Sequence, residues 1–165
     1  IVYGMSAYRL ANDLSISRKM AKSYIDSYFK RYAGVRRFID ATIENTRETG
    51  EVSTIFGRKR RMDDIKSANA TVRGYAERAA INTPIQGSSA DLIKLAMIKL
   101  AEELETQNME AKILLSVHDE IILECPLEEK QELTGLTKDV MENIYPLKVP
   151  LKVNFGSGQN WAEAH

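Results

Sequence analysis

The sequence is poor in cysteine, and this scarcity excludes several classes of protein. Cys125 is the single cysteine among 165 residues. One thiol excludes an internal disulfide framework and a cysteine-rich zinc site, and it fits a reducing, cytoplasmic compartment. The 23 basic and 23 acidic side chains cancel, so bulk charge indicates no nucleic-acid partner. Any such signal has to be local.

Long apolar runs are also missing. No run reaches the roughly 20 residues of a membrane span, and no secretory leader pattern is seen, so we expect no membrane partner. The sequence opens at Ile1, in mid-pattern and without an initiator methionine, so we expect a piece of a longer protein. Its 44% apolar content suffices for the core of one domain or of a large part of one.

The first half of the sequence predicts helices and one strand. Ser17 can cap a helix, Gly34 breaks the helical spacing, and a second helix then runs to Gly50. Glu51–Phe56 is rich in β-branched residues and predicts a strand that leads into the basic run Arg58–Arg61.

A third helix is predicted to begin at Ser67 or Asn69 and to end or kink at Pro84. Ser88 and Asp91 form a capping-box-like pair at the start of a further helix.

The second half predicts a buried helix, a hairpin, a helix and a last strand. Leu92–Leu104 is apolar on more than one face, which favours the most buried helix of the chain. Ile113–Val117 and Ile121–Cys125 suit the two strands of a hairpin. Pro126 suits the first turn of another helix, and Val149–Phe155 predicts a strand. This order indicates an α+β fold, mainly helical, with a small antiparallel sheet.

The predicted hairpin turn is the strongest candidate for chemistry. It places His118, Asp119 and Glu120 at a sheet edge, where carboxylates could meet a divalent cation or a phosphate. Mg²⁺ keeps several waters and takes only one or two carboxylates, so Asp119 is the candidate ligand. A two-metal phosphoryl-transfer site needs an acid from a second strand. A solvated acidic turn is the alternative.

A polar row lies on the helix before Pro84. Arg78 and Asn82 are four residues apart and share one face, and Gln86 extends the line. These side chains are donors for the minor-groove acceptors that every base pair presents at similar places. Such a row would test the geometry of a base pair without reading its sequence. The alternative is an ordinary polar helix end. Tyr3, before Gly4, could stack on a base or be a common surface tyrosine.

Taken together, four stretches resemble the C-terminal part of a family A DNA polymerase. They occur in the family's order and cover essentially the whole chain: Ile1–Leu10, Ala76–Asp91, Leu115–Glu120 and Gly156–His165. The resemblance implies that about residues 1–50 are fingers helices and that about 51–165 are palm, with a palm-type sheet. It also implies a cytoplasmic, nucleoid-associated enzyme of DNA replication and repair.

The resemblance also implies roles for single residues. Asp119 would be the palm aspartate that binds catalytic Mg²⁺, Glu120 its secondary neighbour, and His118 a contact to the primer end. The minor-groove contacts would be Arg78, Asn82 and Gln86, and Tyr3 would lie beside the insertion site. The implied reaction adds a deoxynucleoside triphosphate to a primer 3′ end on primer–template DNA.

The family's other palm aspartate and its triphosphate-gripping residues would lie upstream of Ile1. We therefore expect only part of a two-metal site here, an inactive segment, and the remainder of the parent chain as its partner. Two other hypotheses stay open. One is a non-catalytic nucleic-acid-binding module, and the other is a small metal-dependent phosphatase or nuclease built on the hairpin turn.

Overall fold

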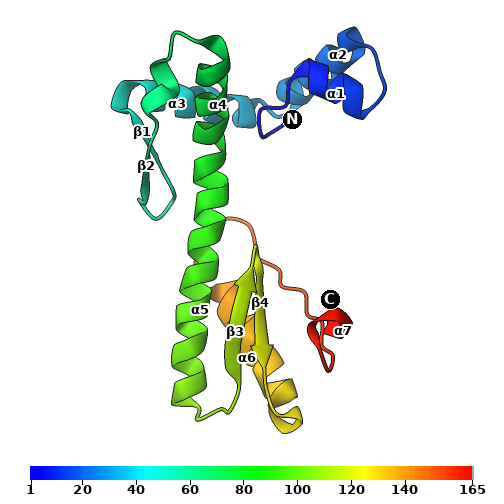
Figure 1. Ribbon diagram of the computed structural model, residues 1–165, viewed down its shortest axis with the longest axis vertical. Coiled ribbons are helices and arrows are strands. Elements are labelled where there is room, and N and C mark those ends of the chain that lie inside the picture. Colours follow the sequence, from blue (N-terminus) through cyan, green and yellow to red (C-terminus); the bar gives the residue numbers. More distant parts are fainter. Residues whose placement is uncertain (165) are drawn as a thin grey trace. The chain divides into compact units, whose positions relative to one another are not determined.

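The computed structural model describes residues 1–164 and confirms the α+β class. The last residue of the Gly156–His165 stretch lies outside this range. The chain forms two compact units, the first of residues 1–88 and the second from Ser89 onward. Figure 1 draws the elements of each unit. The predicted division into fingers and palm concerns roles and stays a prediction.

The first unit begins with three helices. These are α1 (Ala7–Asp13), α2 (Arg18–Arg31) and α3 (Ala33–Thr49). The Ser17 hydroxyl accepts from the backbone N–H of Met20 at 3.2 Å, so the predicted cap of α2 is confirmed.

The end of α3 was predicted correctly, and the break before it was not. Gly50 ends α3 in the left-handed region with φ 77°, which glycine adopts at little cost. The break between α2 and α3 lies at Tyr32, whereas Gly34 lies inside the first turn of α3. The missing Cβ of Gly34 lowers helix propensity, but one such residue does not stop a helix that packing supports.

A short hairpin follows α3. Strand β1 (Glu51–Ser53) pairs antiparallel with β2 (Lys59–Arg61), with Val52 opposite Arg60. The predicted strand was too long, because the chain turns after Ser53 and residues 54–58 connect the two strands. Part of the basic run is therefore itself a strand.

Helix α4 (Ala70–Asn82) packs against α3 and the 3₁₀ turn η1 (Asp63–Lys66). Asn69 caps it, and its Oδ1 accepts from the backbone N–H of Thr71 at 2.9 Å. A small core holds these elements together, made of Val52, Met62, Ile65, Ala76 and Ala80. A second cluster joins α1 to α2 through Leu10, Ala11 and Ala21.

The helical path passes through Pro84 as a π-helix, η2 (Thr83–Gly87). A proline removes one backbone donor, and a π turn is one way in which a helix absorbs such a gap. The predicted kink is thus a wide turn that leads directly into α5 (Ser88–Thr106). Ser88 is no capping-box residue, because its hydroxyl donates to the Pro84 carbonyl and accepts from the Ile55 backbone N–H.

The second unit contains most of α5, a hairpin and two further helices. Strand β3 (Lys112–Val117) pairs antiparallel with β4 (Glu120–Glu124). The 3₁₀ turn η3 (Leu127–Glu129) leads into α6 (Lys130–Asn143), and α7 (Trp161–Ala164) follows. Pro126 precedes the 3₁₀ turn, so the predicted helix start is displaced by one short turn.

The core of this unit lies where the end of α5 meets the hairpin and α6. Its buried members are Leu104, Ala111 and Leu133, with Ile113 and Leu123 packed against them. The free Cys125 also packs there, only partly buried.

Two sequence predictions for this unit were wrong. Helix α5 exposes 58% of Ile98 and 37% of Leu95, so only one of its apolar faces is covered. Residues 149–155 form no strand, and Val149 is 67% exposed. A β-branched run becomes a strand only where another strand supplies hydrogen bonds. The backbone N–H of Val153 instead donates to the Glu142 carboxylate at 3.1 Å.

No helix within residues 1–164 combines the length and the apolar character that a membrane crossing requires.

Candidate functional site

Arg78 lies close to Tyr75 and Gly4 in the first unit. Its guanidinium carbon lies 4.6 Å from the centre of the Tyr75 ring, one helical turn earlier on α4. The Tyr3–Gly4 turn also comes close to this side chain, since a Cβ added to Gly4 would lie 3.0 Å from Cγ of Arg78. Two residues predicted from distant parts of the sequence, Tyr3 and Arg78, therefore lie in one neighbourhood. Tyr3 itself is 52% exposed.

Asn82 and Gln86 continue the helical path beyond Arg78. Asn82 is the last residue of α4, and its Oδ1 is buried without a hydrogen-bond partner within residues 1–164. An orphaned buried acceptor is uncommon and needs an explanation, such as a partner outside the chain. Gln86 lies in the π-helix and is exposed. π turns are rare and recur at functional sites, which fits a polar side chain displayed there.

The hairpin turn of the second unit places His118 and Asp119 between Val117 and Glu120, which are paired in the ladder. His118 has φ 54°, a left-handed conformation that side chains other than glycine rarely adopt. A positive φ at the first of two turn residues is the pattern of a type II′ turn, where glycine is usual. The histidine is thus held in a costly conformation at the tip of a hairpin, a feature common at functional sites.

The two acids of the turn differ in exposure. Asp119 is exposed at the tip, whereas Glu120 is half-buried at the start of β4. No group of three or more histidine, cysteine or acidic side chains is arranged to hold a metal ion in the part of the chain that the structure describes. One accessible carboxylate with a second beside it still suits Mg²⁺, which keeps much of its water shell.

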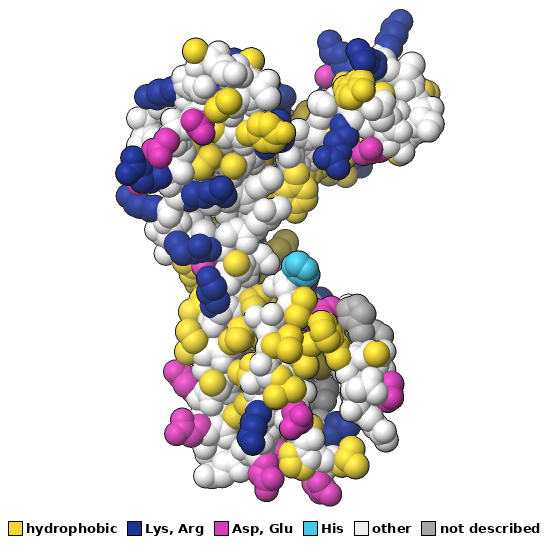
Figure 2. Space-filling view, in the orientation of Figure 1, with side chains coloured by type: hydrophobic (Ala, Val, Ile, Leu, Met, Phe, Trp, Pro, Cys, Tyr) yellow, Lys and Arg dark blue, Asp and Glu magenta, His cyan; other side chains and the backbone are white. Residues whose placement is uncertain are grey.

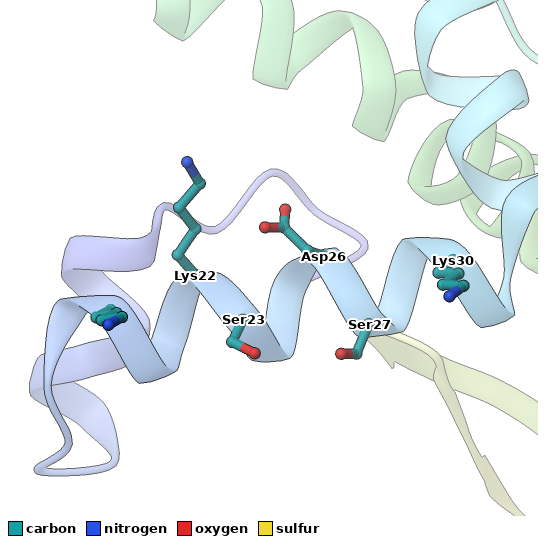
Figure 3. Close-up of a pocket in the computed structure, with 6 residues that line it drawn as sticks. Lys22, Ser23, Asp26, Ser27 and Lys30 are labelled. Atoms are coloured by element: carbon teal, nitrogen blue, oxygen red, sulfur yellow. The ribbon is translucent and has the colours of Figure 1, made fainter.

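A hollow on helix α2 of the first unit carries no candidate site. It has a volume of about 420 Å³, and all of its lining residues come from α2, including Lys22, Asp26 and Lys30. In Figure 3 the labelled side chains project from the one helix, which is the picture of a solvated charged face.

A smaller pocket of about 250 Å³ lies between the β1–β2 hairpin and the π-helix, and Gln86 lines it. Lys and Arg side chains gather over this hairpin in Figure 2. Each of them has a partner within the chain. Lys59 pairs with Glu51, and Arg61 pairs with Asp63 at 3.1 Å.

The other two arginines of the run, Arg58 and Arg60, contact the π-helix. Arg58 donates to the Gly87 carbonyl at 3.1 Å, and Arg60 donates to the Thr83 hydroxyl at 3.4 Å. The basic run is therefore engaged with its own fold.

Comparison with known proteins decides the family. The model of DNA polymerase family A matches residues 1–163. The chain belongs to DNA polymerase family A. It is 52% identical over 163 residues to DNA polymerase I of Caldicellulosiruptor bescii, and the aligned region covers 99% of this chain and 19% of the relative. It is 46% identical over 164 residues to the thermostable DNA polymerase I of Thermus aquaticus, and the aligned region covers 99% of this chain and 20% of the relative.

The fold of the family is also confirmed. A solved structure described as the POL domain of Pol1 from M. smegmatis, in complex with DNA primer-template and dNTP, matches with a TM-score of 0.94. It is 44% identical and covers 99% of this chain and 29% of that chain. The chain thus spans about a fifth of the length of the curated family A relatives and carries one part of their polymerase domain.

Sequence reasoning missed residues that support the predicted site. Tyr75 was not among the candidate residues, although its spacing of three from Arg78 could have indicated the contact between the two side chains. The contacts of Thr54, Arg58 and Gly87 join segments about 30 residues apart, and no local pattern shows such contacts.

Proposed function

We propose that this chain is the part of a template-directed DNA polymerase that supplies minor-groove contacts and one catalytic carboxylate. The observation that carries the proposal is the family match over residues 1–163 together with the likeness to a polymerase domain bound to DNA primer-template and dNTP. The intact protein then adds deoxynucleotides to a primer 3′ end in replication and repair. Its substrates are primer–template DNA and deoxynucleoside triphosphates, and the remainder of its own chain completes the site.

The polar row is proposed to contact the minor groove. Arg78, Asn82 and Gln86 carry N–H donors, and purine N3 and pyrimidine O2 are acceptors at similar positions in every base pair. A misplaced pair moves these acceptors, so the row responds to pair geometry and not to sequence. The support is that the Arg78 guanidinium lies 4.6 Å from the Tyr75 ring and that Gln86 is exposed on the π-helix. Tyr3, exposed beside Arg78, is proposed to lie near the template base.

The hairpin tip is proposed to carry the chemistry. Asp119 would hold Mg²⁺, with Glu120 as a secondary neighbour. When bound, the ion would supply charge stabilisation to the phosphoryl transfer, as one member of a two-metal site. His118 is proposed to contact the primer end, and its positive φ sets the direction in which its Cα–Cβ bond leaves the turn.

An Asp119→Ala variant of the intact polymerase tests the assignment. Loss of charge stabilisation worth several kcal/mol should lower kcat for primer extension by roughly 10³-fold or more. DNA affinity should change little, because the groove contacts remain. Glu124→Ala is a matched control, since it removes an exposed acid from the far end of β4, the strand that begins directly after Asp119. Retained turnover, or a large loss of DNA affinity, would contradict the role of Asp119.

A Gln86→Ala variant tests the minor-groove proposal. Extension should fall by a similar factor on templates of every sequence, because the acceptors are shared by all base pairs. Single-turnover extension on the four template bases measures this. An effect restricted to one base pair would contradict a role in checking pair geometry.

The separated 165-residue segment is proposed to be inactive. Its hairpin supplies a single acidic pair, whereas a two-metal site needs carboxylates from more than one strand. A primer-extension assay with Mg²⁺ on the purified segment measures this, and nucleotide incorporation would contradict it. In the cell we propose that the intact enzyme is cytoplasmic and lies on the nucleoid, where its template is.

A further inference from the structure

We propose that Arg58 is a positioning residue that clamps the π-helix Thr83–Gly87 and thereby fixes the direction of Gln86. This inference rests on the proposed function, since it concerns Gln86 as a contact to the primer–template minor groove. It assigns a structural cause to the orientation of one side chain in that row. The clamp is the connection of residues 54–58 between β1 and β2.

The first step is the hydrogen bond between the clamp and the helix. Arg58 Nη2 donates to the carbonyl of Gly87, the residue that follows Gln86. The backbone of Arg58 is itself anchored, because its N–H donates to the Thr54 hydroxyl at 3.2 Å. The same hydroxyl accepts from the Phe56 backbone N–H at 3.3 Å. The guanidinium therefore reaches the helix from a well-defined loop.

The loop also packs against the π-helix so closely that Gly87 has no room for a side chain. A Cβ added to Gly87 would lie 2.7 Å from Cγ2 of Thr54. Ordinary carbon contacts are about 3.5–4.0 Å, so only glycine lets the loop and the helix approach this closely. Gly87 is required here for its small size.

Two more hydrogen bonds flank this contact. The Ile55 backbone N–H donates to the Ser88 hydroxyl at 3.0 Å, and that hydroxyl donates to the Pro84 carbonyl. Arg60 reaches the Thr83 hydroxyl at the other end of the π-helix, and that hydroxyl donates to the Ala79 carbonyl at 2.7 Å. A π turn lacks the regular hydrogen-bond ladder of an α-helix, so such external contacts can set its shape.

The pocket between hairpin and helix also has the composition of an anion site, with three cations among its lining residues. Two of these, Arg58 and Arg60, point their donors at the π-helix, and Lys59 pairs with Glu51. Engaged donors favour the positioning role over phosphate binding. Gln86 lines the same pocket, so we expect a change in the clamp to alter the position of this side chain.

A double-mutant cycle in the intact polymerase tests the inference. Arg58→Met keeps the aliphatic part of the side chain and removes the donors. We expect it to lower kcat/KM for matched primer extension by roughly tenfold, the size of one charged hydrogen bond. Gln86→Ala should have a loss of similar size, and the double variant should lose no more than Gln86→Ala alone.

The matched control is Arg73→Met. Arg73 also donates to a backbone carbonyl, that of Ser67 at 2.8 Å, but near the start of α4 and away from Gln86. The fold loss in kcat/KM caused by Arg73→Met should multiply with the fold loss caused by Gln86→Ala. A general loss of stability would move both arginine variants alike, whereas a positioning role couples only Arg58 to Gln86. Arg58→Lys, which keeps a donor, should recover part of the activity.

The possible outcomes distinguish a failure of the Arg58 clamp from a failure of the role proposed for Gln86. Multiplying losses for Arg58→Met and Gln86→Ala, or no loss in Arg58→Met, would overturn the clamp and leave the proposed function standing. No loss in Gln86→Ala would overturn the role of Gln86 in the proposed function, and the clamp with it.

A second pair of variants decides the matter if Arg58→Met does not fold. Gly87→Ala should lower matched extension, because its Cβ meets Cγ2 of Thr54. Thr54→Ser removes that methyl group and keeps the hydroxyl, so adding it to Gly87→Ala should restore most of the loss. Absence of rescue by Thr54→Ser would overturn the clamp.

Discussion

Replacing Gly4 by alanine should displace the Arg78 side chain while leaving Arg78 itself unmutated. Gly4 has φ 79°, and a Cβ placed there would lie 3.0 Å from Cγ and 3.5 Å from Cδ of Arg78. Two costs are therefore expected, one from the backbone conformation and one from the contact. Gly50 offers the means to separate them, because it has φ 77° and nothing within 4 Å of its added Cβ.

The magnitudes can be worked out from these facts. An L-residue in the left-handed region costs about 1–2 kcal/mol, and the reduced entropy of the unfolded chain returns about 0.4–1 kcal/mol. Gly50→Ala should thus lower the free energy of unfolding by about 1 kcal/mol. Gly4→Ala adds the mild overpacking of one methyl group, about 1 kcal/mol more, for a total of about 2 kcal/mol.

The functional consequence follows from the same contact. Cγ of Arg78 has to move by about 0.5 Å to reach an ordinary carbon contact. Because a 1 Å misplacement can cost about a hundredfold in rate, we expect Gly4→Ala to lower kcat/KM for primer extension about tenfold. Gly50→Ala should leave kcat/KM close to that of the parent enzyme.

The assay is single-turnover primer extension by the intact polymerase, with thermal unfolding measured in parallel. Equal losses of kcat/KM in the two alanine variants would show that general stability, and not the position of Arg78, limits the reaction. An unchanged kcat/KM in Gly4→Ala would show that the reaction does not depend on the space that Gly4 leaves for Arg78.

Three further predictions concern the second unit. His118→Gly should raise the free energy of unfolding by about 1 kcal/mol by relieving the left-handed strain, while primer extension falls; a drop in stability would contradict this. Glu129→Gln should lower the free energy of unfolding by about 1–2 kcal/mol, because the Glu129 carboxylate accepts from two backbone N–H groups at 2.8 and 3.0 Å. Urea unfolding measures this change.

The hydrogen bond from Lys99 lowers the pKa of Glu103, so its stabilising effect is present at neutral pH and lost as the pH falls through that lowered pKa. Lys99→Met should return the pKa of Glu103 toward its ordinary value in an NMR titration.

Local signals predicted the elements whose causes are local. The cap at Ser17 and the left-handed stop at Gly50 depend on a few neighbouring atoms, so residue type alone reveals them. The hairpin around Asp119 was also predicted, because two apolar runs flank a short polar turn. The positive φ of His118 was not, since only a small share of histidines adopt it and residue type alone does not mark which ones.

Features that depend on distant partners could not be predicted from local patterns. Val149–Phe155 has strand composition but finds no ladder within the described residues. Ser88 looks like a cap, yet its hydroxyl serves a loop 33 residues earlier. The roles of Asp119 and of the Arg78 row came from the resemblance to the polymerase family, and they stay predictions.

The β3–β4 hairpin has a practical consequence for anyone who produces this segment alone. Within the described chain it is a two-stranded sheet, so both outer edges keep unpaired backbone groups. Leu114 and Leu115 are 53% and 41% exposed on it, beside a break in the strand register. Open apolar edges invite pairing between molecules. Precipitation at high concentration is therefore the expected behaviour, and a solubilising fusion or an added strand that covers one edge is the remedy to try first.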